Sequence, residues 1–222
     1  MKLLAIDTST ELASVAVLSG EEITCEEQGS QRTHAQLLLP MINRQLVQAG
    51  LQMNQLDGII FGCGPGSFTG LRIACSIAKG LAYAHDLDLI PVSSLAAIAW
   101  AAREHPDCAS SPIVAVLDAR MHEMYWGFYP ADQWEADERV NPAQEISLPV
   151  NQPVVLAGVG IELYWNDFSD LIKSQISSRL NLFPNAAAMI KLVQHTGINP
   201  VPAAQAQPVY VRNQVTQGDS RG

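Results

Sequence analysis

Hydrophobic and polar positions follow two different periods along the first half of the chain. Short apolar runs at Leu3–Ile6, Ala13–Leu18 and Ile23–Glu27, separated by polar turns, predict three strands joined as two consecutive hairpins. Apolar residues then recur every three or four positions from His34 to Ala49, which predicts a helix that ends at Gly50. The chain therefore opens with a hairpin layer followed by a long helix.

The pattern continues with alternating strand and helix segments. Gly58–Gly62 reads as a short buried strand, and a glycine-rich loop leads from it into a helix over Phe68–Ala84. Leu87–Val92 predicts a further strand, after which Ser93 caps a third helix that ends near Arg103. With the two hairpins, these segments make a β-β-β-α-β-α unit.

A second, less regular series follows residues 105–112, a segment rich in Pro and Ser that is typical of a domain boundary. Ile113–Leu117 is an apolar strand, and Glu123–Tyr129 alternates like its hairpin partner. Further along, the pattern predicts a strand at Val154–Ala157 and an Ala-rich helix over residues 185–195.

Both series begin with a strand that ends in an aspartate, at Asp7 and again at Asp118. We interpret this as an internal duplication whose second copy is degenerate. The sequence therefore predicts an α/β protein with a first domain over 1–108 and a smaller second domain over 109–222. The tail beyond Gly197 is expected to pack back on the first domain.

Composition and charge narrow the class of partners. The chain has 222 residues, of which 48% are hydrophobic and 16% charged, against a usual charged share of about 25%. The high hydrophobic share and the low charged share exclude a disordered chain and indicate a surface partly covered by another protein. The net charge of −9 gives no drive for tight binding to tRNA or to an anionic membrane. The four cysteines form no CxxC pair, and no apolar run is long enough for a membrane span, which favours a cytoplasmic protein.

The glycine-rich loop is the most distinctive local feature. Its residues include Gly62, Gly64, Gly66 and Gly70, at a strand-to-helix junction where backbone amides can bind an anion. The loop is neither a Walker loop nor a GxGxxG fingerprint, and glycines at such a junction also serve tight turning alone. Asp7 and the hydroxyl residues after it likewise suit either a ligand-binding turn or a turn that serves the fold alone. The candidate cofactor-binding residues are Asp7, Gly64, Gly66 and Asp118.

The helix after the loop is apolar around more of its circumference than one buried face requires. Residues with small side chains recur every four positions on it and would let another helix approach closely. The preceding helix carries two apolar residues in a polar rim, typical of a contact patch. We therefore predict a partner interface on this helix pair, formed by Leu37, Met41, Gly70, Ala74, Ala78, Leu81 and Ala82.

Two positions argue against catalysis and metal binding. His34 has Leu38 four residues later, where a second metal ligand on the same helix face would stand. Asp118 is followed by Arg120 at a position where a phosphate-binding turn would favour Gly. No catalytic residue and no metal ligand is therefore assigned.

Five segments together resemble the TsaB family, also called YeaZ: LAIDTST at 4–10, HAQLLLP at 34–40, GPGSFTGLR at 64–72, DARM at 118–121 and PVYVR at 208–212. The resemblance covers nearly the whole chain. It implies two ribonuclease H-like domains of the actin, sugar-kinase and Hsp70 superfamily, with mixed sheets flanked by helices. It also implies a role in forming N6-threonylcarbamoyladenosine at position 37 of tRNAs that read ANN codons.

The resemblance further implies a scaffold without its own catalytic site, an inactive homologue of a glycoprotease family. The implied partners are the catalytic paralogue TsaD and the ATPase TsaE, with a homodimer when the chain is alone. In that paralogue two His on the first helix bind metal, and they align with His34 and Leu38. No cofactor is expected for the chain by itself, and ATP or ADP only in the assembled complex. The alternative is an ATP-dependent phosphotransferase or hydrolase that uses Asp7, Asp118 and the loop 62–70.

Overall fold

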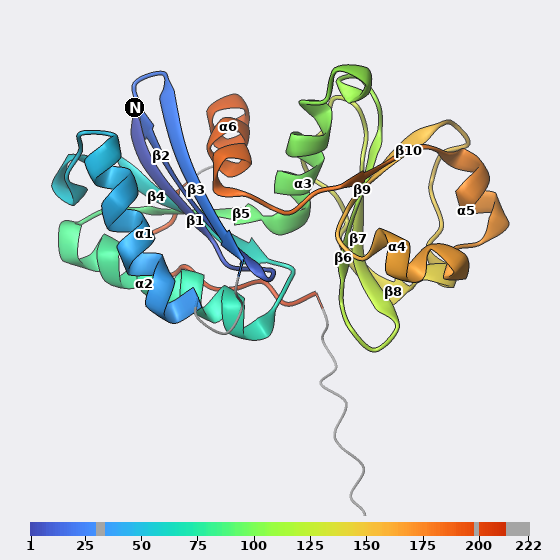
Figure 1. Cartoon of the computed structure of the whole chain (residues 1–222), viewed down its shortest axis with the longest axis horizontal. Helices are drawn as coiled ribbons and strands as arrows, with labels where there is room; N and C mark the ends of the chain where they lie inside the picture. Colours follow the sequence, from blue (N-terminus) through green and yellow to red (C-terminus); the bar gives the residue numbers. More distant parts are fainter. Residues whose placement is uncertain (30–33, 198–199, 212–222) are drawn as a thin grey trace, which may run out of the picture.

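A computed structural model describes residues 1–29, 34–197 and 200–211. The described chain forms two lobes, each built on a mixed five-stranded sheet (Figure 1). The first sheet has the order β3-β2-β1-β4-β5 and the second the order β10-β9-β6-β7-β8. The strands of the first sheet are β1 (Lys2–Asp7), β2 (Leu12–Ser19), β3 (Glu22–Gly29), β4 (Gly58–Gly64) and β5 (Leu89–Ser93). Those of the second are β6 (Ile113–Asp118), β7 (Glu123–Tyr129), β8 (Arg139–Pro142), β9 (Val154–Gly158) and β10 (Ile176–Asn181).

The apolar strands of the first sheet are buried on both faces. Because successive side chains of a strand point to opposite faces, Leu4 and Ile6 of β1 pack on one side and Leu3 and Ala5 on the other. Helices α1 (His34–Gln48) and α2 (Phe68–His85) cover the first of these sides. Helix α6 (Ala186–Thr196) covers the other side, packing on β1, β2 and β4.

The second lobe repeats the antiparallel–parallel mixture with shorter helices. Strand β6 pairs antiparallel with β7 and parallel with β9, as β1 pairs with β2 and β4. Its outer face is covered by the short helices α4 (Ile161–Tyr164) and α5 (Asp170–Gln175). Single turns of 3-10 helix occur at Met53–Gln55, Pro106–Cys108, Ala143–Glu145 and Trp165–Asp167.

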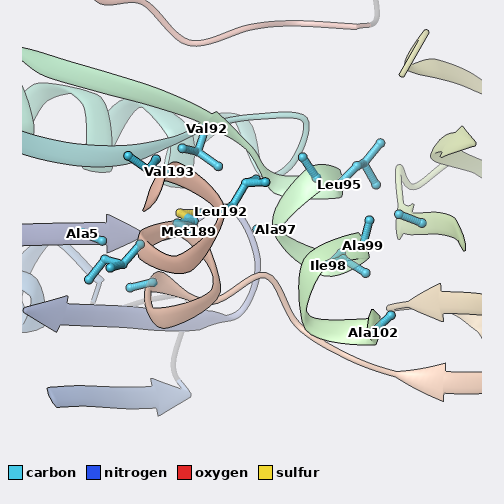
Figure 2. Packing of buried hydrophobic residues seen from close by; sticks show 14 of the residues in the cluster. Ala5, Val92, Leu95, Ala97, Ile98, Ala99, Ala102, Met189, Leu192 and Val193 are labelled. Carbon is cyan, nitrogen blue, oxygen red and sulfur yellow. The ribbon is translucent and has the colours of Figure 1, made fainter. Parts of the chain in front are cut away.

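Helices α3 (Ser94–Arg103) and α6 lie side by side between the two sheets (Figure 2). Their buried side chains, among them Leu95, Ile98 and Met189, join strand residues of both lobes in one apolar core. Helix α3 packs mainly on β6 and β9 of the second sheet, although it precedes that sheet in the sequence. The predicted units 1–108 and 109–222 therefore exchange helices across a shared core.

Residues 200–211, here called the C-terminal strap, run along the first lobe. Val201 pairs with Leu89 at the edge of β5, and the Val209 amide donates to the Cys63 carbonyl oxygen at 2.7 Å. The Lys79 ammonium of α2 donates to the Ala206 carbonyl oxygen at 3.0 Å. The strap thus ties α2 to the end of β4.

Every strand and helix named from the sequence is present within a few residues of its expected ends. Two edge strands, β8 and β10, were not predicted. Strand β10 has the sequence ISSRLN, and its side chains alternate only between half-buried and exposed, so its strand signal is weak. No helix in the described residues is long and apolar enough to span a membrane.

Candidate functional site

The glycine-rich loop packs directly on the turn that follows β1. The Ser67 amide donates to the Ser9 carbonyl oxygen at 2.7 Å, and the Thr8 hydroxyl donates to the Gly70 carbonyl oxygen at 2.7 Å. A Cβ atom at Gly66 would overlap the Ser9 carbonyl, and one at Gly70 would overlap the Thr8 carbonyl. These two glycines are therefore required for close packing of the loop on the chain itself.

Asp7 lies beneath this loop and is fully buried. Its Oδ1 accepts hydrogen bonds from the Ser9 amide at 3.0 Å and the Ser9 hydroxyl at 2.8 Å. Its Oδ2 has no hydrogen-bond partner among the described residues, and a Cβ atom at Gly62 would overlap it. Burial raises the pKa of Asp7 to about 7, against the smaller opposite effect of the Ser9 hydrogen bonds. The carboxyl group is enclosed by protein.

A cleft of about 650 Å³ separates the two lobes near this turn. The first lobe contributes hydroxyl groups from Ser9, Thr10 and Ser67, and the second contributes Asp118 and Gly160. Asp7 is absent from its lining. The cleft thus brings together the turn after β1, the start of α2 and the turn after β6, but it presents only one of the two predicted aspartates.

Asp118 borders this cleft and is already engaged. The Arg120 guanidinium forms an ion pair with its Oδ2 at 2.9 Å, while the Tyr164 hydroxyl donates to its Oδ1 at 2.9 Å. The backbone at Arg120 is left-handed, with φ of 62°, a conformation that favours glycine. A phosphate-binding turn would favour Gly at this position, as the sequence predicts, and the left-handed backbone at Arg120 is the conformation that such a Gly would adopt.

The remaining candidates lie apart from the cleft. His34 is buried at the start of α1, where its Nε2 lies 3.2 Å from the Glu11 carbonyl oxygen. Leu38 is a core residue of the same helix. Within residues 1–29, 34–197 and 200–211, no group of three or more His, Cys, Asp and Glu side chains is placed to hold a metal ion. Gly64 adopts φ of 121° and faces the Val209 carbonyl of the strap.

The structure corrects most of the predicted partner interface. Five of its seven residues are buried within the chain: Met41, Gly70, Ala74, Ala78 and Ala82. The small side chains let α2 lie close to its own sheet, whereas the sequence analysis assigned this close approach to a partner. The other two, Leu37 and Leu81, are half-buried. The pattern of small residues does not distinguish a sheet from a second helix as the neighbour.

Apolar side chains do reach the outer surface of the helix pair, but all except Leu81 stand at positions outside the predicted set. Leu39 and Val47 of α1 are 51% and 70% exposed. Ile73 and Ile77 of α2 are half-buried and pack against the core of the first lobe. We call Leu39, Val47, Ile73, Ile77 and Leu81 the helix-pair surface.

Comparison with known proteins identifies the family of this chain. A family model described as "TsaD: tRNA N6-adenosine threonylcarbamoyltransferase" matches residues 22–159. A Haemophilus influenzae protein named tRNA threonylcarbamoyladenosine biosynthesis protein TsaB is 37% identical over 97% of this chain and 95% of its own length. The chain belongs to the TsaB family. The Escherichia coli protein of the same name is 32% identical over 97% of this chain and 96% of that protein.

A solved TsaB-family structure agrees with the fold. The structure titled "YeaZ from Pseudomonas aeruginosa" has a TM-score of 0.84 and 35% identity, and the match covers 94% of this chain and 99% of that one. The resemblance drawn from the five sequence segments is confirmed, as is the α/β fold with two mixed sheets. The chain is thus a tRNA threonylcarbamoyladenosine biosynthesis protein.

Proposed function

We propose that this TsaB-family chain is a non-catalytic scaffold subunit required for N6-threonylcarbamoyladenosine formation at position 37 of tRNAs that read ANN codons. In this role it binds and supports the catalytic subunit TsaD together with the ATPase TsaE. The observation that carries the proposal is the state of the two aspartates at the strand ends. Asp7 is enclosed without access to the cleft, and Asp118 is paired with Arg120.

The chemistry of phosphoryl transfer explains why the state of these two aspartates bears on the function. Such a reaction relies on carboxylates that hold Mg²⁺ against the phosphates of a bound nucleotide. To act in this way, Asp118 would have to exchange its Arg120 partner for the metal, and Asp7 would have to become exposed through the loop 62–70. Gly62, Gly66 and Gly70 are packed on the 7–9 turn too closely for the loop to leave it without losing its contacts.

One observation favours the alternative of an ATP-dependent phosphotransferase or hydrolase. The cleft of about 650 Å³ lies between the lobes and is lined by hydroxyl groups and by Asp118, as a nucleotide site would be. Isothermal titration of the isolated chain with ATP and Mg²⁺, together with an ATP hydrolysis assay, separates the two functions. Under the scaffold proposal the isolated chain neither turns over ATP nor binds it tightly, and a nucleotide enters only in the assembled complex.

The proposed contact with TsaD, and with a second copy when the chain is alone, is the helix-pair surface. Its exposed and half-buried apolar residues lie on two helices that cover the same face of the first sheet. Charged residues are sparse there, which suits the centre of a protein interface. The net charge of −9 supports the further proposal that tRNA is not bound tightly by this chain alone.

Reconstitution tests the proposal directly. The chain is mixed with TsaD, TsaE and unmodified tRNA, and modified adenosine is measured by mass spectrometry. The proposal expects full dependence on this chain and full activity of the Asp118→Asn variant, because Asp118 is assigned no chemical role. Loss of modification by a folded Asp118→Asn protein that still binds TsaD would overturn the scaffold role and favour the enzyme.

A further inference from the structure

A second cavity, of about 400 Å³, lies next to the start of the glycine-rich loop, where Cys63 and Gly64 line it. It is enclosed by the end of β4, the β5–α3 junction, the end of α6 and the loop after β7, and it shares no lining residue with the interlobe cleft. Its walls are mainly apolar and include Pro91, Ala96, Leu192 and Trp134. A cavity of this size with a few converging polar groups has the form of a small-molecule site.

The polar groups of this cavity are one carboxylate and its two hydroxyl donors. Glu138 Oε1 accepts hydrogen bonds from the Tyr129 hydroxyl at 2.8 Å and from the Ser93 hydroxyl. Both of these bonds reach the same oxygen, which leaves Oε2 for another donor. Ser93 also caps α3, since its Oγ accepts from the Leu95 and Ala96 amides. The carboxylate is thus held in place by groups that are themselves fixed by the fold.

The cavity is lined by acidic groups and by no cation. Its lining contains Glu135 and Glu138 and no Lys, Arg or His. No ion pair joins Glu138 to a cation in the part of the chain that the structure describes. The cation beside it, Arg103, lies 4.1 Å from the centre of the Trp134 ring and donates to the carbonyl oxygens of Tyr129, Pro130 and Gln133.

We propose that this cavity binds an organic cation, an alkylammonium or guanidinium group whose charge is held by Glu138 and whose carbon chain contacts the walls formed by Leu192 and Trp134. A carboxylate in a mostly apolar enclosure gains most from a ligand that brings both an opposite charge and hydrogen-bond donors. Burial already raises the pKa of Glu138 above its usual value, and a bound cation would oppose that effect. The cation is supplied either by a free amine or by a Lys or Arg side chain of a partner protein.

The test uses the full chain and three probes. Agmatine represents a free amine with a guanidinium, a blocked Gly-Arg-Gly peptide represents a side chain on a protein, and 1-butanol is an uncharged control. Binding is followed by heteronuclear NMR, with shifts expected at Ala96, Leu192 and Thr196. Agmatine or the peptide should bind at least about tenfold more tightly than butanol, and the tighter of the two identifies the source of the cation.

Two variants and a matched control keep the test decisive. Glu138→Gln should weaken cation binding about tenfold, whereas Glu145→Gln, an equal change of charge at an exposed site in the second lobe, should not. Because Glu138 also supports Ser93, the second variant is Thr196→Trp, at the exposed last residue of α6, which lines the cavity; the larger side chain should occupy part of the cavity. Absence of cation binding, or binding that folded Glu138→Gln and Thr196→Trp proteins retain in full, would overturn the proposal.

Discussion

In the first lobe the central strand β1 ends at a carboxyl group enclosed by protein, whereas in the second lobe the matching strand β6 ends at a carboxylate beside the cleft. Asp7 has lost its access to solvent under three glycines. Asp118 has kept a place at the cleft but is paired with Arg120. Under the proposed scaffold role, the same strand–aspartate pattern is kept from catalysis by two different physical means, burial in one lobe and ion pairing in the other.

The two lobes also differ in what covers their outer faces. The first carries two long helices, α1 and α2, with an apolar outer surface, and the second carries only the short α4 and α5. The lobe with the more tightly packed aspartate is thus also the lobe with the helix-pair surface. Under the proposed scaffold role, the close packing of the first lobe would hold the helix-pair surface in place for a partner.

The largest effect is expected where the loop contacts the Asp7 turn. Gly70→Ala should lower the free energy of unfolding by about 3 kcal/mol, because the new methyl group would overlap the Thr8 carbonyl oxygen. Gly80→Ala in the same helix has open space around it and should stabilise by about 0.5–1 kcal/mol. Chemical denaturation of both variants measures this. Equal stability of the two would show that the loop is not tightly packed on the turn.

Asp7 itself should give the first lobe a characteristic pH dependence. Its pKa is about 7 in the fold and 3.8 as the ordinary value, so the folded state retains a proton that the unfolded state has lost. The stabilisation that the bound proton gives the folded state is complete below the pKa of Asp7 in the unfolded state. It is lost as pH rises through about 7, by a few kcal/mol in total.

Asp7→Asn removes this titration, so the variant should lose less stability than the wild type between pH 4 and pH 8. Denaturant midpoints across that range measure the difference, and Gly80→Ala should keep the wild-type slope. A wild-type and Asp7→Asn pair with parallel pH profiles would show that Asp7 titrates normally and is not enclosed.

The next prediction concerns the outer helices. Ile77→Asp should weaken association with TsaD, and with a second copy, by about tenfold or more, because a charge would enter an apolar contact. Leu171→Asp on α5 is the matched control, since Leu171 is 68% exposed in the second lobe and should leave association unchanged. Light scattering and titration measure both. Ala78→Glu is unsuitable, because Ala78 is fully buried and the fold itself would fail.

The sequence was sufficient to predict most of the elements, but not the edge strands β8 and β10, and it did not predict which elements pack against each other. Periodicity located β1, α1 and α2 because their apolar positions repeat strongly. It could not tell whether Ala74 and Ala78 face a sheet or another helix, because both neighbours favour small side chains. The exchange of α3 and α6 between the lobes depends on contacts between residues far apart in the chain, which no local pattern records. The burial of Asp7 likewise depends on a loop more than fifty residues away.

The smallest effect is expected at the second aspartate. Arg120→Gly removes an ion pair whose guanidinium is largely exposed, and such pairs contribute about 0–1 kcal/mol. It also relieves a left-handed backbone, as His122→Gly does at the same φ of 62°. The two variants therefore relieve a backbone with the same φ, and Arg120→Gly should be only about 0.5 kcal/mol less stable than His122→Gly. Thermal melting measures that difference in stability.

Titration with ATP and Mg²⁺, with an ATP hydrolysis assay, measures whether the released Asp118 carboxylate supports nucleotide binding or turnover. Because Asp7 stays enclosed, the Arg120→Gly protein should still show no ATP turnover. ATP turnover in Arg120→Gly, but not in His122→Gly, would show that the Arg120 ion pair alone prevents turnover in the wild type. The enclosure of Asp7 would then not be needed to explain the inactivity.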